Sequence, residues 1–475
     1  MHPTLRPIIA LSILTAAACE SGRDVPDGGG VQSDAGRPDG SAVDSGADSG
    51  SADAAGADVG RRDGGGPDPE GAPILERTPR QSYDCRVTRA ASSLAPRRWS
   101  WQGHSLLATT GGQRFLARVE SMSDDPFTPG TPELLISTLA LDATFGANPA
   151  RPSTADPSTV GPIVLARRQD AIAAVWVEGA ALRFTALDAS GALSVAAKDI
   201  TGARADSLST LQWVEGQDGF GLLWQVEGQS ALRFVPLTRG GDVAGASVEI
   251  SRASALGPIG AAIAPLADGY AIVWQEGTPQ RAHVWFKTVD AAGVERTPRV
   301  RLSVVDEDGV YAGSGSGFSR AGLSMLPIAG GFLVAWAEVS GGDFSTGGGG
   351  YGVIRIAKVD GAGTLASIPA ALRAKEEDVD EVEPVLFNLG TAAGVAWSRG
   401  SHIYACGGCM PDHRIDLVLL DPSDLVPVSN VVSIPPAPSG LLGKSLSATG
   451  ADLLATFHIT YHVHFEPGSA ALTCD

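Results

Sequence analysis

Cysteine and histidine residues with metal-ligand spacing gather near the C-terminal end of the chain. His402, Cys406, Cys409 and His413 follow the pattern His-x3-Cys-x2-Cys-x3-His. Two thiols three positions apart and flanked by imidazoles have the chemistry and the reach to bind zinc or copper. In an oxidising compartment the same two cysteines would instead form a disulfide that pins a hairpin loop. We take this disulfide as the first interpretation and the metal site as its alternative, with redox activity behind both because no thioredoxin-like pattern surrounds the motif.

A second histidine group follows about fifty residues later. If residues 458–465 form a strand, the alternation of side chains places His458, His462 and His464 on one face. If the two histidine segments belong to adjacent structural units, they could join His402 and His413 in one metal site. The simpler interpretation is a polar strand face without a ligand.

Other signatures of catalysis are weak. The sequence contains no Gly-x-Ser-x-Gly elbow, no His-Glu-x-x-His and no P-loop, so we name no catalytic residue. The acidic run 376–383 is interpreted as a solvated loop or one helical turn that ends before Pro384. The formal net charge of −18 argues against nucleic acid as a partner.

These segments lie within a repeated unit that must position them. Each unit begins with a short apolar run, which ends in Trp in most copies, and continues through a gap to an alternating run and an Asp or Gly turn. Further short apolar stretches precede and follow this pair. Seven copies of the first run occur, at residues 112–119, 170–176, 218–224, 268–274, 330–338, 392–397 and 451–457.

Four short strands per unit, with about 48 to 62 residues between units, are typical of β-propeller blades. The runs are too short and too rich in β-branched residues for helices. We therefore predict an all-β fold, a seven-bladed β-propeller over residues 83–475, with six blades or an irregular closure as the alternative. The Trp residues are expected to pack between blades rather than to stack on a ligand.

The pattern resembles a repeat of large secreted and surface proteins of Gram-negative bacteria, in which Gly-Gly-Phe-Val-Val-x-Trp precedes an alternating strand and Asp-x-x-Gly. Gly330 to Trp336, and Asp360 to Gly363, carry this resemblance. It covers roughly residues 105–465 and implies a fold and an extracellular setting. It implies no reaction, because members of the group mostly lack an assigned activity.

The first 82 residues read as an export signal and a tether. Residues 1–18 have the layout of a signal peptide, and the small residues before Cys19 resemble the lipobox of bacterial lipoproteins, in which this Cys is lipidated. Ordinary cleavage at the same bond is the alternative. Residues 19–82 are mostly Gly, Ala, Ser, Asp and Pro and are expected to form a disordered acidic linker.

Cysteine arithmetic supports the lipid anchor and predicts how the ring closes. An exported protein rarely keeps an odd thiol, and lipidation of Cys19 leaves four of the five cysteines to pair. Cys85 begins a possible strand and Cys474 is penultimate. We predict a disulfide between them that closes the last blade.

From the sequence we expect a non-enzymatic binding lipoprotein. It would be anchored in the outer membrane through its lipid, on the cell surface or the periplasmic face, and would bind a protein or glycan ligand as a monomer. We expect the ligand to contact the inserts that vary most, at residues 121–131, 341–351 and 398–411. The alternatives are a metal-binding protein or metal-dependent hydrolase or lyase that uses the His and Cys group, and a structural envelope protein. No other cofactor is expected.

Overall fold

The computed structural model separates the chain into two units, Met1–Gly65 and Gly66–Asp475, and only the second contains described residues. The described residues are 73–94, 104–108, 111–121, 132–152, 154, 159–168, 171–204, 211–216, 219–225, 231–251, 260–278, 281–303, 322–340, 351–373, 379–401, 414–435, 441–461 and 464–475. No helix in these ranges is long and apolar enough to cross a membrane.

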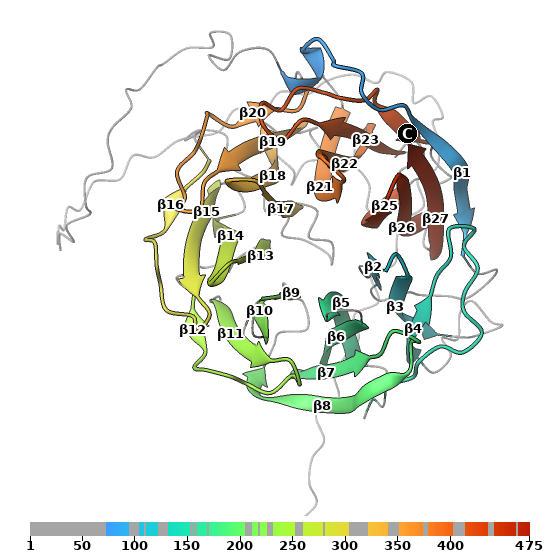
Figure 1. Ribbon diagram of the computed structural model, residues 1–475, viewed down its shortest axis with the longest axis vertical. Helices are drawn as coiled ribbons and strands as arrows, with labels where there is room; N and C mark the ends of the chain where they lie inside the picture. Colours follow the sequence, from blue (N-terminus) through green and yellow to red (C-terminus); the bar gives the residue numbers. More distant parts are fainter. Residues whose placement is uncertain are drawn as a thin grey trace, which may run out of the picture. The chain divides into compact units, whose positions relative to one another are not determined.

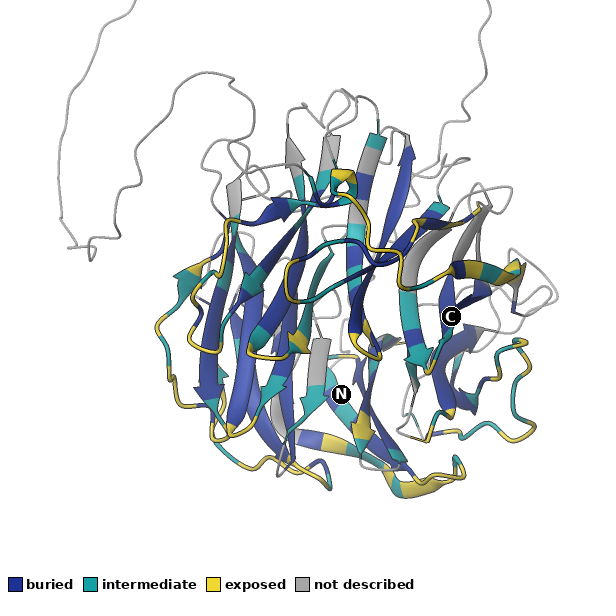
Figure 2. Cartoon of the chain, turned by 45° about the horizontal axis from the view of Figure 1, so that its top comes forward, coloured by how far each residue is buried: buried dark blue, intermediate teal, exposed yellow. Residues whose placement is uncertain are grey.

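Seven antiparallel sheets surround a central axis and form a β-propeller (Figure 1). The innermost strand of each sheet contacts the innermost strand of the next, and the last contacts the first, so the ring is closed. The prediction of seven blades is confirmed, and the six-bladed alternative is wrong. The strands in the middle of the blades are buried along much of their length (Figure 2).

Blades 1 to 3 follow one another in the chain. Among the described residues blade 1 has three strands, and a single bridge between Ile136 and Ala150 lies where a fourth would pair. The strands of blade 1 are β2 (His104–Ala108), β3 (Arg114–Ser121) and β4 (Pro132–Thr138). Those of blade 2 are β5 (Val160–Arg168), β6 (Ala171–Glu178), β7 (Ala181–Leu187) and β8 (Leu193–Arg204). Those of blade 3 are β9 (Leu211–Glu215), β10 (Gly219–Gln225), β11 (Leu232–Thr238) and β12 (Val248–Glu249).

Blades 4 to 6 each have four strands in chain order. Blade 4 contains β13 (Ala261–Leu266), β14 (Gly269–Thr278), β15 (Arg281–Asp290) and β16 (Val300–Arg301). Blade 5 contains β17 (Leu323–Ile328), β18 (Gly331–Ser340), β19 (Tyr351–Val359) and β20 (Ala370–Ala371). Blade 6 contains β21 (Val379–Leu389), β22 (Ala392–Ser401), β23 (Arg414–Leu420) and β24 (Val432–Ile434).

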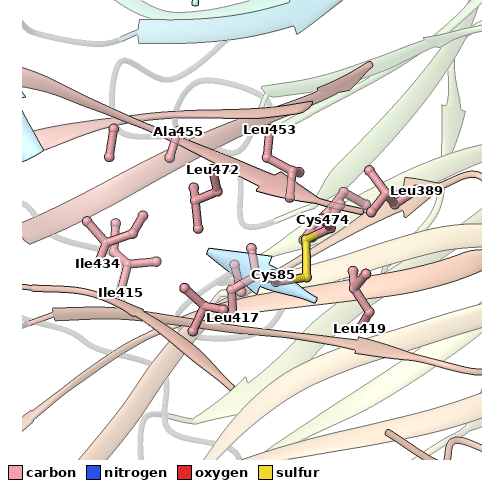
Figure 3. Close-up of a cluster of buried hydrophobic side chains, with 14 of the residues drawn as sticks. Cys85, Leu389, Ile415, Leu417, Leu419, Ile434, Leu453, Ala455, Leu472 and Cys474 are labelled. Atoms are coloured by element: carbon pink, nitrogen blue, oxygen red, sulfur yellow. A yellow bond between two sulfur atoms is a disulfide. The ribbon is translucent and has the colours of Figure 1, made fainter. Parts of the chain in front are cut away.

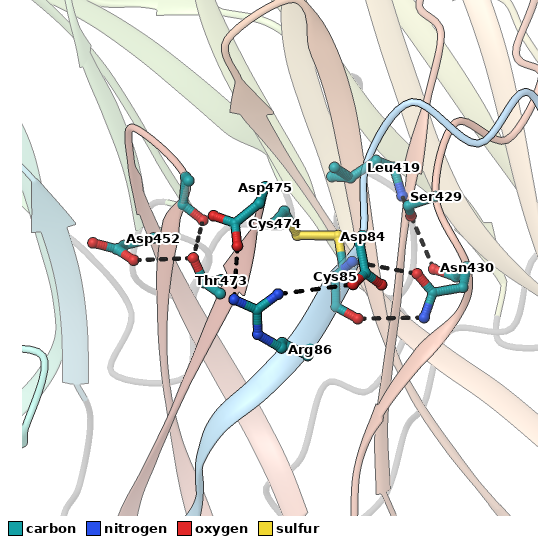
Figure 4. Close-up of a disulfide and its surroundings, with 11 residues drawn as sticks. Asp84, Cys85, Arg86, Leu419, Ser429, Asn430, Asp452, Thr473, Cys474 and Asp475 are labelled. Carbon is teal, nitrogen blue, oxygen red and sulfur yellow. Dashed lines mark hydrogen bonds and ion pairs between the residues drawn. A yellow bond between two sulfur atoms is a disulfide. The ribbon is translucent and has the colours of Figure 1, made fainter.

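Blade 7 joins the two ends of the described chain. It contains β25 (Leu441–Thr449), β26 (Asp452–Tyr461) and β27 (His464–Cys474), and β1 (Cys85–Ser93) is its outermost strand. Cys85 pairs with Cys474 in the β1–β27 register, and a disulfide joins them, as predicted (Figure 4). Arg86 adds a 2.7 Å ion pair to Asp475. The ring is thus closed by backbone pairing, a covalent bond and a surface ion pair.

Residues before β1 extend along blades 5 and 6. Ile74, in the short 3-10 helix η1 (Ile74–Glu76), is fully buried, and the Leu75 N–H donates to the carbonyl of Leu372. Further on, Tyr83 forms a parallel bridge with Ser429. The folded unit therefore begins before residue 83.

Apolar clusters fill the spaces between blades because each second strand is covered on both faces. The cluster between blades 6 and 7 is typical, with Ile415, Leu417 and Leu419 facing Leu453 and Leu472 (Figure 3). Burial on both faces explains why these strands are continuously apolar rather than alternating in the sequence.

The two ends of the blades differ. At the end that we call the turn end, the connections from first to second strand are tight, as between Leu266 and Gly269. In blades 2, 4 and 5 the connections from third to fourth strand share one design there, in which an Asp carboxylate caps the turn, whereas in blade 3 the Thr238 hydroxyl accepts from the Asp242 N–H. Asp360, for example, accepts 2.8 Å hydrogen bonds from the backbone N–H groups of Ala362 and Thr364. Asp188 and Asp290 do the same.

The opposite end, the insert end, carries the connections from second to third strand and those between successive blades. In blade 2 the former is a tight turn between Glu178 and Ala181, whereas in blades 5 and 6 residues 341–350 and 402–413 occupy the same place in the chain. Connections as different as these, on a ring of similar blades, indicate where the molecule is specialised.

Candidate functional site

Most of the predicted site residues lie outside the described residues. These are Cys19, His402, Cys406, Cys409, His413 and His462. Their lipidation, disulfide and metal-binding roles stay predictions. His458 lies in β26, and His464 is the first residue of β27, which pairs antiparallel with β26. The prediction of a single strand over residues 458–465 is therefore wrong.

The topology brings both histidine segments to the insert end of neighbouring blades. Strand β22 ends at Ser401 and β23 begins at Arg414, while β26 ends at Tyr461 and β27 begins at His464. Each segment joins the second strand of its blade to the third, and blades 6 and 7 contact each other. The strand ends that flank the two segments therefore lie on neighbouring blades. Within the described ranges themselves, no group of three or more His, Cys, Asp or Glu residues could hold a metal ion.

The Trp residues of the repeat are packing elements. Those of blades 2 to 6 lie in the second strand and are at most 2 % exposed (Trp176, Trp224, Trp274, Trp336, Trp397). Each belongs to an apolar cluster against the preceding blade. Buried aromatic rings of this size contribute through the area they remove from water. The prediction that they fill space between blades is confirmed.

The buried indole N–H groups still need acceptors, and in blade 5 the sequence supplies one two residues later. The Trp336 Nε1–H donates to Glu338 over 3.0 Å, and the Arg355 Nε donates to the same carboxylate over 2.8 Å. Arg355 is the cross-strand partner of Trp336. The equivalent bonds in blades 2 and 4 are Trp176 to Glu178 and Trp274 to Glu276. We call this arrangement the Trp–Glu–Arg unit.

Blade 6 carries the same unit with its charges exchanged. The residue two positions after Trp397 is Arg399 rather than Glu, and the cross-strand partner of Trp397 is Asp416 rather than Arg. The acceptor for the Trp397 indole N–H is Glu381 of β21, at 3.1 Å. The exchange leaves two carboxylates buried near the insert end of blade 6.

Each buried carboxylate in this blade has basic neighbours. Asp416 is fully buried and accepts hydrogen bonds from Arg414 Nε at 2.9 Å and from Ser433 Oγ at 2.6 Å. Glu381 lies 3.6 Å from Arg373 and 4.0 Å from Arg399. We call Arg373, Glu381, Arg399, Arg414 and Asp416 the blade 6 charge cluster.

Glu381 is the residue of this cluster that titrates near neutral pH. Glu381 is 4 % exposed, and burial raises the pKa of its carboxyl group to about 7. Arg373, Arg399 and the indole N–H of Trp397 oppose that rise, and Asp416 adds to it. A carboxyl group of this kind can hold or release a proton within the physiological range. On the neighbouring strand, Glu381 pairs with Arg399, two residues before β22 ends at Ser401 and the insert 402–413 begins.

The sequence interpretation of the run 376–383 is wrong for its second half. Residues from Val379 onward form strand β21, with a register shift between Val382 and Val385, and Glu381 is buried. A dense acidic run usually marks a solvated segment, which is why the strand was missed. One signal was available: the residue two positions after Trp397 is Arg, so the buried indole had to find its acceptor elsewhere.

Comparisons with known proteins add no activity. No protein-family model and no curated protein sequence matches the chain. Among solved structures, a Dyadobacter fermentans protein of unknown function is similar at 11 % identity and a TM-score of 0.45, over 82 % of this chain and 99 % of that one. Kuenenia stuttgartiensis hydrazine synthase is similar at 11 % identity and a TM-score of 0.43, over 76 % and 93 %. A prolyl endopeptidase is similar at 14 % identity and a TM-score of 0.41, over 76 % and 46 %. Overlaps this weak carry no functional argument.

Proposed function

We propose that this chain is a binding module whose insert end contacts a protein or glycan ligand. The difference between the two ends of the blades carries the proposal. The turn end repeats one Asp-capped design in blades 2, 4 and 5, whereas connections at the insert end vary in length and composition from blade to blade. Strands that hold a ring together are expected to be alike, and loops that recognise a ligand are expected to differ.

The proposed setting follows from the N-terminal sequence. Residues 1–18 would direct export, Cys19 would carry the lipid, and the acidic linker would hold the propeller away from the outer membrane. The chain would act there as a monomer. Mass spectrometry of the mature N-terminus tests this part, because an unacylated Cys19 would remove the anchor without affecting the binding proposal.

The main experiment applies the purified mature protein to glycan and peptide arrays and then alters one insert at a time. Blade 2 provides the design for the alteration, since it joins the same two strands by the short turn at residues 179–180. Replacing residues 341–350 by Gly-Ala should keep the fold and lower array binding at least about tenfold. The matched control is Ala362→Trp, an exposed position at the turn end of the same blade. Absence of array binding, or equal binding by all three proteins, would refute the proposal.

A second candidate function, metal binding, is supported by the strand ends that flank the two histidine segments, which lie at the insert end of neighbouring blades. His402, His413, His458, His462 and His464 would be the ligands, with Cys406 and Cys409 as thiolates or as a disulfide. Metal analysis of the purified protein should then find stoichiometric zinc or copper that His462→Ala removes. An enzyme of the hydrolase or lyase class would require the same metal. A sub-stoichiometric metal content that His462→Ala does not change would therefore argue against both the metal-binding protein and the metal-dependent enzyme.

A further inference from the structure

The interface between blades 7 and 1 contains buried polar side chains beside a small apolar cluster. Phe115 of β3 packs toward blade 2, and because side chains alternate along a strand, Arg114, Leu116 and Arg118 face the other way. Leu116 shares a small cluster with Leu454 of blade 7, which confirms the direction. Two arginines thus enter an interface whose counterparts elsewhere in the ring hold aromatic or aliphatic side chains.

The guanidinium group of Arg118 is bonded within its own blade. Arg118 is 4 % exposed, donates to Glu120 at 2.6 Å and to Ser137 at 2.8 Å, and lies over the ring of Phe145 at 4.2 Å. Its position corresponds to that of Trp in blades 2 to 6, two residues before a Glu. Arg118 is therefore a structural substitute for the indole.

The guanidinium group of Arg114 is less completely bonded. Arg114 is 7 % exposed, its buried Nε has no hydrogen-bond partner among the described residues, and its Nη2 reaches only the backbone carbonyl of Asp452 at 3.4 Å. Burial lowers its pKa, and the charge of Asp452 partly offsets this effect. The Asp452 carboxylate itself accepts a 3.3 Å hydrogen bond from Thr473 (Figure 4). A guanidinium group removed from water with an unpaired N–H carries a free-energy cost that a ligand would offset.

Blade 7 presents unpaired hydroxyl groups to the same interface. Leu446 and Ala448 pack toward blade 6, so the alternate residues of β25, Ser447 and Thr449, face blade 1. Their buried hydroxyl oxygens, with that of Thr456, have no partner in the described part of the chain. Buried polar atoms in proteins are normally bonded to protein, water or ligand, and four unpaired ones in a single interface point to a bound species.

A pocket opens at the turn end of blade 1 beside this interface, and all of its lining residues come from blade 1. Its volume is about 490 Å³, which falls in the range of small-molecule sites, about 300 to 1,000 Å³. Arg114, Thr138 and Phe145 are among its lining residues. Gly112 also lines it and has φ of +82°; a Cβ there would lie 2.9 Å from Thr449 Cγ2, so the glycine lets the two blades meet at the pocket.

We propose that this pocket binds a small molecule through a carboxylate group, with Arg114 as its cationic partner. Guanidinium groups match the planar geometry of a carboxylate and donate to it through Nε and a terminal nitrogen. A single negative charge suits the site better than a phosphate dianion does, because Asp452 lies beside Arg114 and would repel two charges more strongly.

The test titrates the full mature protein with glucuronate and N-acetylglycine, and with glucose and N-acetylglycinamide as their uncharged counterparts. We expect saturable binding of a carboxylate and binding of its uncharged counterpart weaker by at least about tenfold. Arg114→Lys, which keeps the charge and removes Nε, should weaken carboxylate binding. Ala140→Trp, at an exposed lining position, should abolish it without disturbing the interface, and Ala189→Trp, in an exposed turn of blade 2, is the control.

Equal affinity for the charged and uncharged compounds would overturn the proposal, as would no binding of either carboxylate at millimolar concentration. So would retention of binding by Ala140→Trp. A crystal structure soaked with carboxylate that shows only water at Arg114 would be equally decisive. The site lies at the turn end, so shortening the 341–350 insert should leave it unchanged. Its failure is thus separable from failure of the proposed function.

Discussion

The indole N–H of Trp397 donates a 3.1 Å hydrogen bond to Glu381, a carboxyl group on the neighbouring strand that burial keeps close to its protonation midpoint at neutral pH. The pair lies near the insert end of blade 6. It links a packing element of the ring to the segment that precedes the His and Cys insert, and it makes the stability of this blade sensitive to pH.

Glu381→Gln should remove that sensitivity. The folded pKa of about 7 lies above the ordinary value of 4.5, so the native state gains stability from the protonated form below pH 4.5 and loses it as pH rises through 7. The loss in free energy of unfolding should reach about 3 kcal/mol in the wild type and be absent from the variant. Denaturant unfolding at several pH values measures it. Parallel pH profiles for the two proteins would show that Glu381 does not titrate as described.

Trp336 and Glu338 should be energetically coupled. Trp336→Phe removes the indole N–H and some buried area and should cost about 1 to 3 kcal/mol of unfolding free energy. A double-mutant cycle with Glu338→Ala should give a coupling energy of about 1 kcal/mol, because the two side chains share a 3.0 Å hydrogen bond. Strict additivity would contradict the Trp–Glu–Arg unit. Array binding should be unchanged in Trp336→Phe, since this Trp is a packing residue.

The Cys85–Cys474 disulfide should stabilise a ring that can close without it. Cys85→Ser with Cys474→Ser should lower the free energy of unfolding by about 6 kcal/mol in the entropic model, because the bond closes a loop across most of the chain. The pairing of β1 with β27 and the Arg86–Asp475 ion pair remain, so circular dichroism should still report a folded β protein. Either of two results would contradict this expectation: a free energy of unfolding that does not change when the disulfide is reduced, or a double-Ser variant that is completely unfolded.

The glycine of the Asp-capped turn should be required at one position and dispensable at another. Gly363 has φ of +88°, and a Cβ there would lie 3.0 Å from the Phe286 ring of blade 4, so Gly363→Ala should cost about 1 to 2 kcal/mol or more. Gly361, two residues earlier, has open space around the same atom. Gly361→Ala should be neutral within about 0.5 kcal/mol. Equal thermal unfolding of the two variants would show that the turn does not hold the blades together.

Much of the fold could be predicted from the sequence because every copy of the repeat must bury an apolar second strand between two neighbouring blades. The Trp runs identified the second strands, and the positions of Cys85 and Cys474 gave the closure. The missing fourth strand of blade 1 could not be predicted, because short apolar stretches occur in every copy. Neither could the unpaired Nε of Arg114, since its environment is built from strands more than three hundred residues away.

The candidate site was predicted less well, for a physical reason. Electrostatic partners such as Glu381 and Arg399 meet across strands, so local sequence patterns describe each charge without its neighbours. The acidic run around Glu381 resembled a solvated segment, although part of it is a buried strand. The strand order places the ends that flank the two histidine segments on adjacent blades.

The most direct test of the binding proposal is hydrogen–deuterium exchange of the mature protein with and without its strongest array ligand. We predict slower exchange in the insert-end connections, such as 341–350 and 402–413, and unchanged exchange in the turns that begin at Asp188, Asp290 and Asp360. Protection confined to those turns, or none anywhere in the ring, would contradict the account.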